Sequence, residues 1–278
     1  MTLRPVLKKL AGQPTTDGAG VRLKRFIGSN EISFVDPFLL LDEFKNEDPK
    51  AYMAGFPEHP HRGFETVSYM IEGRMRHRDS RGNSGLLTAG SAQWMTAARG
   101  IIHSEMPEMD TSAAHPMLWG YQLWVNLPSH LKMGEPRYQD IPPEKIPEVE
   151  TDDYRVRLIA GEYAGKGGAA QTHIPVIYFD VIFKGDGTFR HEFKSSFNAL
   201  LIGVTGAATV AKDPFAAGDI AVFGGGDAVE VTGTEGTRVL LIAAEPLGEP
   251  VARYGPFVMN TKEEIHQAFA DYEAGKLA

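Results

Sequence analysis

The sequence of 278 residues contains no cysteine. This absence excludes a disulfide framework, a thiolate metal site and a catalytic thiol. Any bound metal must therefore be held by nitrogen and oxygen ligands, which histidine, aspartate and glutamate provide. The sequence also lacks an apolar run near the roughly 18 residues of a transmembrane helix, and residues 1–20 lack the apolar core of a signal peptide. We therefore expect a soluble, cytoplasmic protein that does not bind a membrane.

Positive charge is also scarce. The chain has 28 Lys and Arg against 36 Asp and Glu, which gives a formal net charge of −8. An acidic chain of this kind lacks the broad basic surface that binds nucleic acid, so no direct nucleic-acid binding is expected. The 42% of hydrophobic residues is typical of a globular protein, and the length predicts two domains.

Glycine and proline, with 30 and 18 copies, divide the chain into many short segments. Most of them are rich in β-branched and aromatic residues and end at turn residues, as Thr66–Ile71 does at Gly73. Many short strands separated by turns predict an all-β fold of sandwich or barrel type. A single helix is expected over residues 262–274, because Thr261 and Glu264 have the spacing of a capping box.

A faint internal repeat suggests that the fold is duplicated. Residues 66–73 resemble residues 199–206, and the Ala-Gly pairs at 89–90 and 217–218 have a similar spacing of about 130 residues. Two β-barrels of common origin explain this pattern. A proline-rich, acidic stretch lies between them and is typical of a solvated connector. We therefore predict an N-terminal barrel with a metal site over 1–128, a linker over 129–153, and a metal-free C-terminal barrel with the final helix over 154–278.

Three of the nine histidines lie in two short clusters. His59 and His61 are two residues apart, and so are His103 and Glu105. Residues two apart on a strand project from the same face, so each pair presents two side chains together. If the two strands meet inside a barrel, three imidazoles and one carboxylate converge on a site suited to Fe, Mn, Ni, Cu or Zn. A buried histidine is often a hydrogen-bonded core residue, but two same-face pairs favour metal binding.

The second half of the repeat lacks both pairs. Alignment on Gly73 and Gly206, and then on Gly90 and Gly218, places other residues opposite the four candidate ligands. These are, in order, Glu192, Lys194, Val231 and Gly233. The repeat therefore predicts metal in the N-terminal barrel alone. His191 and Glu192 remain an alternative in the second copy, but no second pair accompanies them.

Four motifs carry a resemblance to a known family. They are HPHRGFETVSYMIEG at 59–73, GSAQWMTAARGIIHSEMPE at 90–108, YQLWVNLP at 121–128 and GPFVMNTKEEI at 255–265. Together they resemble the pirin family of the cupin superfamily. The resemblance implies a bicupin of two jelly-roll-like barrels with one divalent metal per chain. The metal is expected to be Fe(II), with Mn, Ni, Cu, Co or Zn as alternatives, and the implied ligands are His59, His61, His103 and Glu105.

The resemblance implies two kinds of function. Some members are similar to quercetin 2,3-dioxygenases, which open the central ring of a flavonol with O₂ and release carbon monoxide. This activity needs a small planar aromatic substrate, and Glu105 would accept the proton of its 3-hydroxyl group. Other members are similar to redox-sensitive regulators that bind a partner protein. A non-redox cupin isomerase or epimerase is a third hypothesis.

Further residues are candidates for the surroundings of the metal. The walls of an aromatic pocket are predicted at Phe56, Phe64, Trp94 and Met95, although plain core packing explains each equally well. Glu65 stands where many cupins have their carboxylate ligand, but the family pattern favours Glu105, so Glu65 is expected beside the site or on the strand surface. Arg62 is expected to pair with a carboxylate. The remaining histidines are interpreted as surface or structural residues: His77, His115, His130, His173 and His266.

Overall fold

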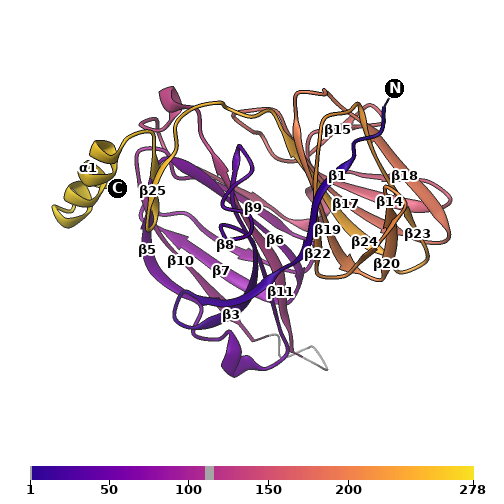
Figure 1. Cartoon of the computed structure of the whole chain (residues 1–278). Helices are drawn as coiled ribbons and strands as arrows, with labels where there is room; N and C mark the ends of the chain where they lie inside the picture. The colour runs from indigo at the N-terminus through magenta and orange to yellow at the C-terminus, as the bar shows by residue number, and fades with distance from the viewer. Residues whose placement is uncertain (1, 110–115) are drawn as a thin grey trace. The chain divides into compact units, whose positions relative to one another are not determined.

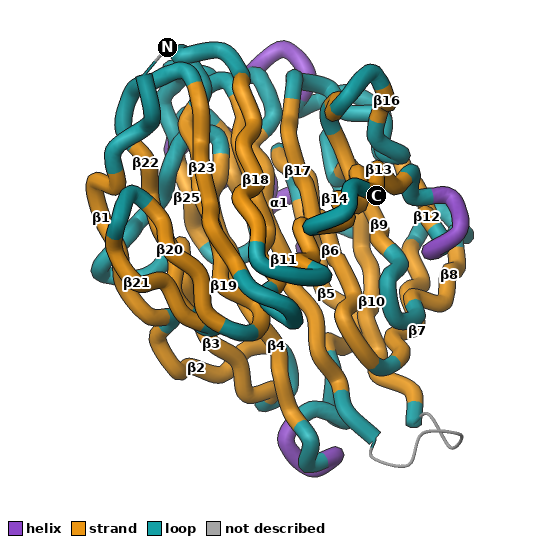
Figure 2. Tube along the Cα trace, turned by 90° about the vertical axis from the view of Figure 1, so that its right-hand side faces the viewer, coloured by secondary structure: helices purple, strands orange, loops and turns teal. Residues whose placement is uncertain are grey.

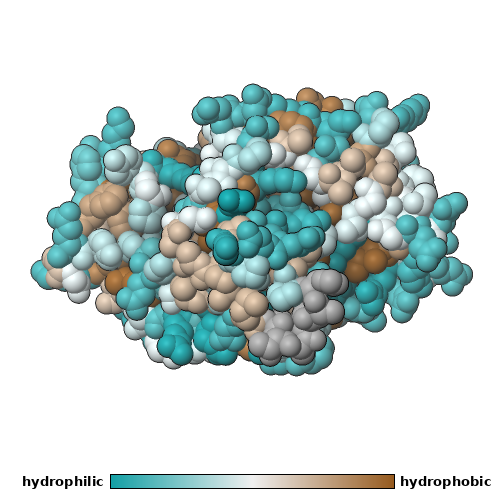
Figure 3. All heavy atoms as spheres, turned by 90° about the horizontal axis from the view of Figure 1, so that it is seen from below, coloured by the Kyte–Doolittle hydropathy of each residue, from teal (hydrophilic) through white to brown (hydrophobic). Residues whose placement is uncertain are grey.

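A computed structural model describes residues 2–109 and 116–278, so His115 lies outside the described residues. The described part consists mainly of β-strands, which Figure 2 shows in orange, with one α-helix, α1 (Lys262–Glu273). The all-β prediction with a short C-terminal helix is therefore confirmed. No helix among these residues is both long and apolar enough to cross a membrane. On the face drawn in Figure 3, hydrophilic residues predominate and hydrophobic residues form separate small areas.

The chain forms two compact units. One unit, the first barrel, combines Gln13–Pro143 with Leu247–Ala278. The other, the second barrel, combines Met1–Gly12 with Glu144–Pro246. Each barrel consists of a seven-stranded and a four-stranded sheet.

The sheets of the first barrel run in the orders β12-β9-β6-β11-β4-β3-β2 and β5-β10-β7-β8. Their strands are β2 (Gln13–Asp17), β3 (Val21–Ile27), β4 (Phe38–Asn46), β5 (Phe56–His61), β6 (Phe64–Glu72), β7 (Arg74–Asp79), β8 (Ser84–Leu87), β9 (Ala92–Thr96), β10 (Ile101–Glu108), β11 (Leu118–Asn126) and β12 (Arg137–Ile141). All neighbours in both sheets are antiparallel.

The second barrel repeats this order, with β1-β22-β19-β24-β17-β14-β13 in one sheet and β18-β23-β20-β21 in the other. Its strands are β1 (Val6–Ala11), β13 (Glu148–Glu150), β14 (Tyr154–Ala160), β17 (Val176–Phe183), β18 (Gly187–Glu192), β19 (Asn198–Thr205), β20 (Ala207–Val210), β21 (Asp213–Ala216), β22 (Asp219–Phe223), β23 (Ala228–Gly233) and β24 (Arg238–Ala244). A small hairpin of β15 (Glu162–Tyr163) and β16 (Lys166–Gly167) completes it. The matching strand orders support the duplication expected from the repeat.

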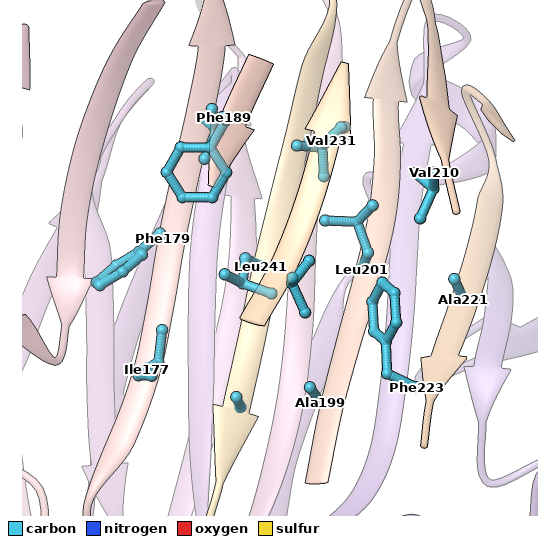
Figure 4. Close-up of a cluster of buried hydrophobic side chains, with 14 of the residues drawn as sticks. Ile177, Phe179, Phe189, Ala199, Leu201, Val210, Ala221, Phe223, Val231 and Leu241 are labelled. Carbon is cyan, nitrogen blue, oxygen red and sulfur yellow. The ribbon is translucent and has the colours of Figure 1, made fainter. Parts of the chain in front are cut away.

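The interior of the second barrel is filled by apolar side chains. Figure 4 shows Phe179, Leu201, Val231 and Leu241 among them, contributed by both sheets. Such a core is close-packed, and burial of its apolar surface stabilises the fold.

The observed units differ from the predicted domain boundaries. The stretch predicted as a linker contains β12 and β13, which pair with β9 and β14, and its Lys132 side chain is buried. The prolines of this stretch lie outside both strands, so they remove no hydrogen bond from either pairing. The N-terminal strand β1 pairs with β22 of the second barrel, whereas α1 belongs to the first barrel.

The C-terminal segment returns to the first barrel as a hairpin of β25 (Ala252–Tyr254) and β26 (Phe257–Met259), followed by α1. Thr261 and Glu264 form the predicted capping box, and Ile265 and Ala268 pack with Phe257. Phe257 of β26 forms a parallel β-bridge with Arg62, the residue directly after β5. Figure 1 shows α1 at the C-terminal end of the chain, near β25. The helix is therefore held by side-chain packing on a strand pair rather than by its own propensity.

A close backbone contact anchors this hairpin beside β5. Gly63 has φ +90°, and a Cβ atom there would lie 1.9 Å from the Val258 carbonyl oxygen. Arg62 pairs with Asp271 of α1 at 2.7 Å, which agrees with the carboxylate partner expected for it. Lys132 Nζ donates to the carbonyl oxygens of Gly63 at 2.6 Å and Val258 at 3.1 Å. The close approach at Gly63 and the contacts of Arg62 and Lys132 thus hold the hairpin and α1 against the segment that follows His61.

Candidate metal centre

The three predicted histidine ligands come together on β5 and β10. These strands are antiparallel neighbours, and His103 lies directly opposite His59 in their register. Because His59 and His61 lie on the same face of β5, all three imidazoles meet inside the first barrel. One nitrogen atom from each ring lies within 4.8 Å of the other two. Among the described residues, this is the only group of three or more such side chains that is arranged to hold a metal ion.

Backbone carbonyls orient the two rings of β5. His59 Nδ1 lies 2.8 Å from the Pro57 carbonyl oxygen, and His61 Nδ1 lies 3.2 Å from that of Pro256. A carbonyl oxygen only accepts hydrogen bonds, so each Nδ1 carries the proton and donates it. The Nε2 atom of each neutral ring then carries a lone pair. These two Nε2 atoms lie 3.1 Å apart, which is close to the separation of about 3.0–3.4 Å between two ligands on one metal ion.

A buried network orients the third ring. Asp79 Oδ2 lies 3.1 Å from His77 Nε2, and His77 Nδ1 lies 3.5 Å from His103 Nδ1. Gln93 Nε2 lies 3.2 Å from the same His77 Nδ1. The carboxylate of Asp79 holds the proton of His77 on Nε2, so His77 Nδ1 accepts from both Gln93 and His103. This arrangement protonates His103 on Nδ1 and leaves a lone pair on its Nε2.

The protonation states suit a cation. Burial, followed by the neighbouring rings, lowers the pKa of His61 and of His103 well below the usual value of histidine. Both imidazoles are therefore neutral near pH 7, which is the form that binds metals. His103 Nε2 is buried and has no hydrogen-bond partner among the described residues. A buried polar atom without a partner is costly, and a metal ion bound by the three Nε2 atoms would compensate it.

Glu105 is buried on the same strand, two residues after His103. Its Oε1 accepts a hydrogen bond from Ser68 Oγ at 2.9 Å, and its Oε2 accepts one from Gln122 Nε2 at 2.6 Å. The group of converging ligand atoms consists of the three histidines and does not include this carboxylate. The role of Glu105 as a fourth ligand therefore stays a prediction.

A cavity of about 510 Å³ reaches His59 and His61. Its apolar walls include Phe56 and Trp124, and Gln122 is one of its polar groups. A cavity of this size and lining is suited to a small aromatic molecule. The cavity connects the histidine cluster with space for a ligand.

The other predicted surroundings of the site occupy different positions. Phe64 packs behind the cavity wall, with its ring centroid 5.0 Å from that of His61 and 4.3 Å from that of Trp124. Trp94 and Met95 are fully buried and do not line the cavity. Glu65 is also fully buried, and its Oε1 accepts a hydrogen bond from Thr96 Oγ1 at 2.7 Å.

Four residues near the site were not singled out from the sequence. Gln122 and Trp124 lie in the YQLWVNLP motif, which carries the family resemblance but contains no metal-ligand pattern. His77 and Asp79 have the same two-residue spacing as the ligand pairs, and this signal was available on β7. His77 is indeed structural, but it contacts His103 directly and is not a surface residue.

The strand registers correct the alignment of the two halves. Pro107 pairs with Met75, the second residue after Gly73, and Gly233 pairs with Ala208, the second residue after Gly206. Counting back along β10 and β23 places Val229, rather than Val231, at the position of His103. Val231 then takes the position of Glu105. The sequence alignment is off by two residues because the loops before these strands differ in length.

The same registers place His191 opposite Val229, as His59 lies opposite His103. His191 is therefore the equivalent of His59, and Phe193 is that of His61. His191 packs against the ring of Phe179, with centroids 5.0 Å apart, and burial lowers its pKa to about 4. A lone imidazole among apolar rings offers one metal ligand instead of three. Of the three histidine positions, the second barrel therefore retains a histidine at one.

Comparison with known proteins extends over both barrels. Residues 20–125 match the family described as Pirin, and residues 178–278 match the one described as Pirin C-terminal cupin domain. A pirin-like protein of Caulobacter vibrioides is 46% identical over 99% of this chain and 100% of its own length. Pirin of Homo sapiens is 42% identical over 98% of this chain and 93% of its own length. A solved quercetin 2,3-dioxygenase from Acinetobacter baumannii matches 100% of this chain and 99% of its own, with a TM-score of 0.91 and 33% identity.

Proposed function

This chain belongs to the pirin family of the cupin superfamily, and we propose that it is a metal-dependent dioxygenase that opens the central ring of flavonols such as quercetin. The observation that carries the proposal is the convergence of three imidazoles next to a cavity with aromatic walls. The similarity of the whole chain to a solved quercetin 2,3-dioxygenase supports the same reaction class.

The Nε2 atoms of His59, His61 and His103 would hold one divalent ion, with Glu105 as the proposed fourth ligand. The donor set suits Fe(II), which the family resemblance favours, and it also admits Mn, Ni, Cu, Co or Zn. A bound redox-active ion would act as a Lewis acid toward the substrate hydroxyl and would support its reaction with O₂.

The residues of the first barrel would prepare the substrate. Trp124 and Phe56 would bind the planar rings and exclude water, because the aromatic faces of a flavonol prefer apolar walls. The Glu105 carboxylate would accept the proton of the 3-hydroxyl group, since Ser68 and Gln122 hold its two oxygens in a fixed orientation. Removal of this proton makes the substrate electron-rich enough to react with O₂, and the ring then opens with release of carbon monoxide.

The resemblance also suggested a redox-sensitive regulator that binds a partner protein. A regulator of this kind needs the histidine cluster but not a ligand cavity beside it. The cavity of about 510 Å³ at His59 and His61 therefore favours catalysis over this alternative.

The test is oxygen-dependent turnover. The protein is loaded with Fe(II) without air, quercetin and air are added, and loss of visible absorbance, O₂ uptake and carbon monoxide are measured. We expect turnover that stops without O₂, whereas turnover without O₂ would indicate an isomerase or epimerase. A Glu105→Gln variant should retain metal by elemental analysis and lose about 10²–10⁴-fold in rate.

The matched control is Glu58→Gln, which changes an exposed carboxylate in the wall of the same cavity. This variant should cleave quercetin at the wild-type rate. Cleavage at the wild-type rate by Glu105→Gln would exclude Glu105 as the base, and the absence of any O₂ uptake with metal bound would exclude the dioxygenase.

A further inference from the structure

Arg253 is the only cation among the described residues that line the cavity beside the histidines. It lies on β25, in the hairpin that returns to the first barrel. Its Nη1 donates to the Leu39 carbonyl oxygen at 2.9 Å, and its Cζ lies 4.7 Å from the centroid of the Trp124 ring. These two contacts fix the guanidinium by one hydrogen bond and one cation–π contact. The hydrogen bond uses one of five N–H groups, and the described residues supply no further acceptor.

The nearby acidic residues are paired with a different arginine. Arg25 binds both oxygens of Asp42, through Nε at 2.9 Å and Nη2 at 2.7 Å. The same Nη2 binds Asp17 Oδ2 at 2.7 Å, and Asp17 Oδ1 accepts from the N–H of Gly18. The oxygens of Asp42 and Asp17 are thus hydrogen-bonded to Arg25 or to backbone and not to Arg253, although the single charge of Arg25 balances only one of the two carboxylates. Glu58, the third acidic residue of the wall, is exposed, so its charge is solvated.

Trp124 connects Arg253 with the histidine cluster. Its ring centroid lies 5.2 Å from that of His61, and Arg253 lies over the same indole. A flat ligand along this wall therefore has one end at the histidines and the other at a guanidinium. Arginine stays charged at every physiological pH, and its planar N–H groups match the two oxygens of a carboxylate.

We propose that Arg253 binds an anionic group of the substrate, so that the cavity prefers planar aromatic acids over neutral aromatic molecules of the same shape. This inference rests on the proposed function, because it adds planar aromatic acids to the flavonols proposed as substrates of the same site. The carboxylate would pair with the free N–H groups of Arg253, while the aromatic part lies along Trp124 and points toward His61. Arg253 acts here as a specificity-determining residue and takes no part in the chemical step.

The experiment compares two probes of equal shape, 2-naphthoate and its neutral amide, 2-naphthamide. Each is titrated by calorimetry into the full-length, metal-loaded protein and into Arg253→Gln. A charge-assisted hydrogen bond contributes about 1.5–3 kcal/mol, so the variant should bind 2-naphthoate about 10–100-fold more weakly. Binding of 2-naphthamide should change less than about threefold. Because the metal is the same in both proteins, any attraction of the carboxylate to it cancels in the comparison.

Two further variants make the result specific. Arg253→Lys keeps the charge and should retain part of the preference for 2-naphthoate. Arg22→Gln removes an exposed arginine outside the cavity wall and should bind both probes as the wild type does. An equal loss of both probes in Arg253→Gln, or no loss at all, would overturn the inference.

The same titrations separate this inference from the proposed function, because binding is measured without turnover. A charge preference that depends on Arg253 in a protein without O₂ uptake would support the anion site and remove the dioxygenase. Quercetin cleavage without any Arg253-dependent preference would support the dioxygenase and exclude the anion site.

Discussion

His77 Nδ1 and His103 Nδ1 lie 3.5 Å apart in the core of the first barrel, and Asp79 bonds the far side of the His77 ring. The carboxylate of Asp79 therefore determines which nitrogen of His103 carries a proton, although it does not touch that ring. Hydrogen-bond partners of this kind orient metal-bound histidines and keep their lone pairs available.

The first prediction concerns this contact. His77→Phe should weaken metal binding about 10–100-fold, because His103 loses its hydrogen-bond acceptor. The new ring would keep the stacking that His77 makes on Tyr138, with centroids 4.6 Å apart. Chelator competition measures the affinity, and His130→Gln, at an exposed position, is the control. An unchanged affinity would show that His77 only fills space.

Metal stoichiometry is the second prediction. The wild type should bind one divalent ion per chain, because the second barrel offers His191 alone where the first offers three histidines. A His59→Ala/His61→Ala variant should contain none. Elemental analysis of purified protein measures both values, and His191→Ala is the control that should keep one ion. Two ions in the wild type would contradict the assignment.

The third prediction concerns the stability of the first barrel. Lys132 is buried and donates to Asn126 Oδ1 at 2.6 Å, in addition to the carbonyls of Gly63 and Val258. Lys132→Met would leave three buried acceptors without a donor, so the free energy of unfolding should fall by about 2–4 kcal/mol. Urea unfolding measures the change, with Lys50→Met at an exposed position as the control. A loss below about 0.5 kcal/mol would show that these contacts do not hold the segment.

The fourth prediction follows from the pKa of His191. Burial lowers this pKa to about 4, whereas the ring in the unfolded chain titrates near 6.5. Between these values the unfolded state binds more protons than the folded state, so stability falls as the pH falls from 6.5 to 4. His191→Leu removes this proton uptake. It should reduce the acid-dependent loss of stability by about 2 kcal/mol, after allowance for the partial exposure of the ring.

The measurement is urea unfolding of the wild type and His191→Leu at pH 7 and pH 4. His266→Leu, which changes an exposed histidine, should retain the pH dependence of the wild type. An identical dependence in His191→Leu would mean that the pKa of His191 does not differ between the folded and unfolded states.

Two features of the chain, one in the site and one in the fold, could be predicted because they are local. The same-face pairs His59/His61 and His103/Glu105 follow from the alternation of side chains along a strand, and the capping box at Thr261 needs only four consecutive residues. The domain boundaries were less accessible. β12 belongs to the first barrel because it pairs with β9, and α1 because Ile265 and Ala268 pack on the hairpin, and neither partner can be read from the segment itself.

By itself the sequence determined the class of fold, the family and the three histidines that can share a metal ion, since these depend on residue types and on short, regular spacings. Tertiary structure alone decided that Pro256 orients His61, that Asp79 acts on His103 through His77, and that Arg253 reaches the cavity wall. These contacts join residues that are far apart in the chain or on different strands, and long-range packing of both sheets with the returning C-terminal hairpin selects them.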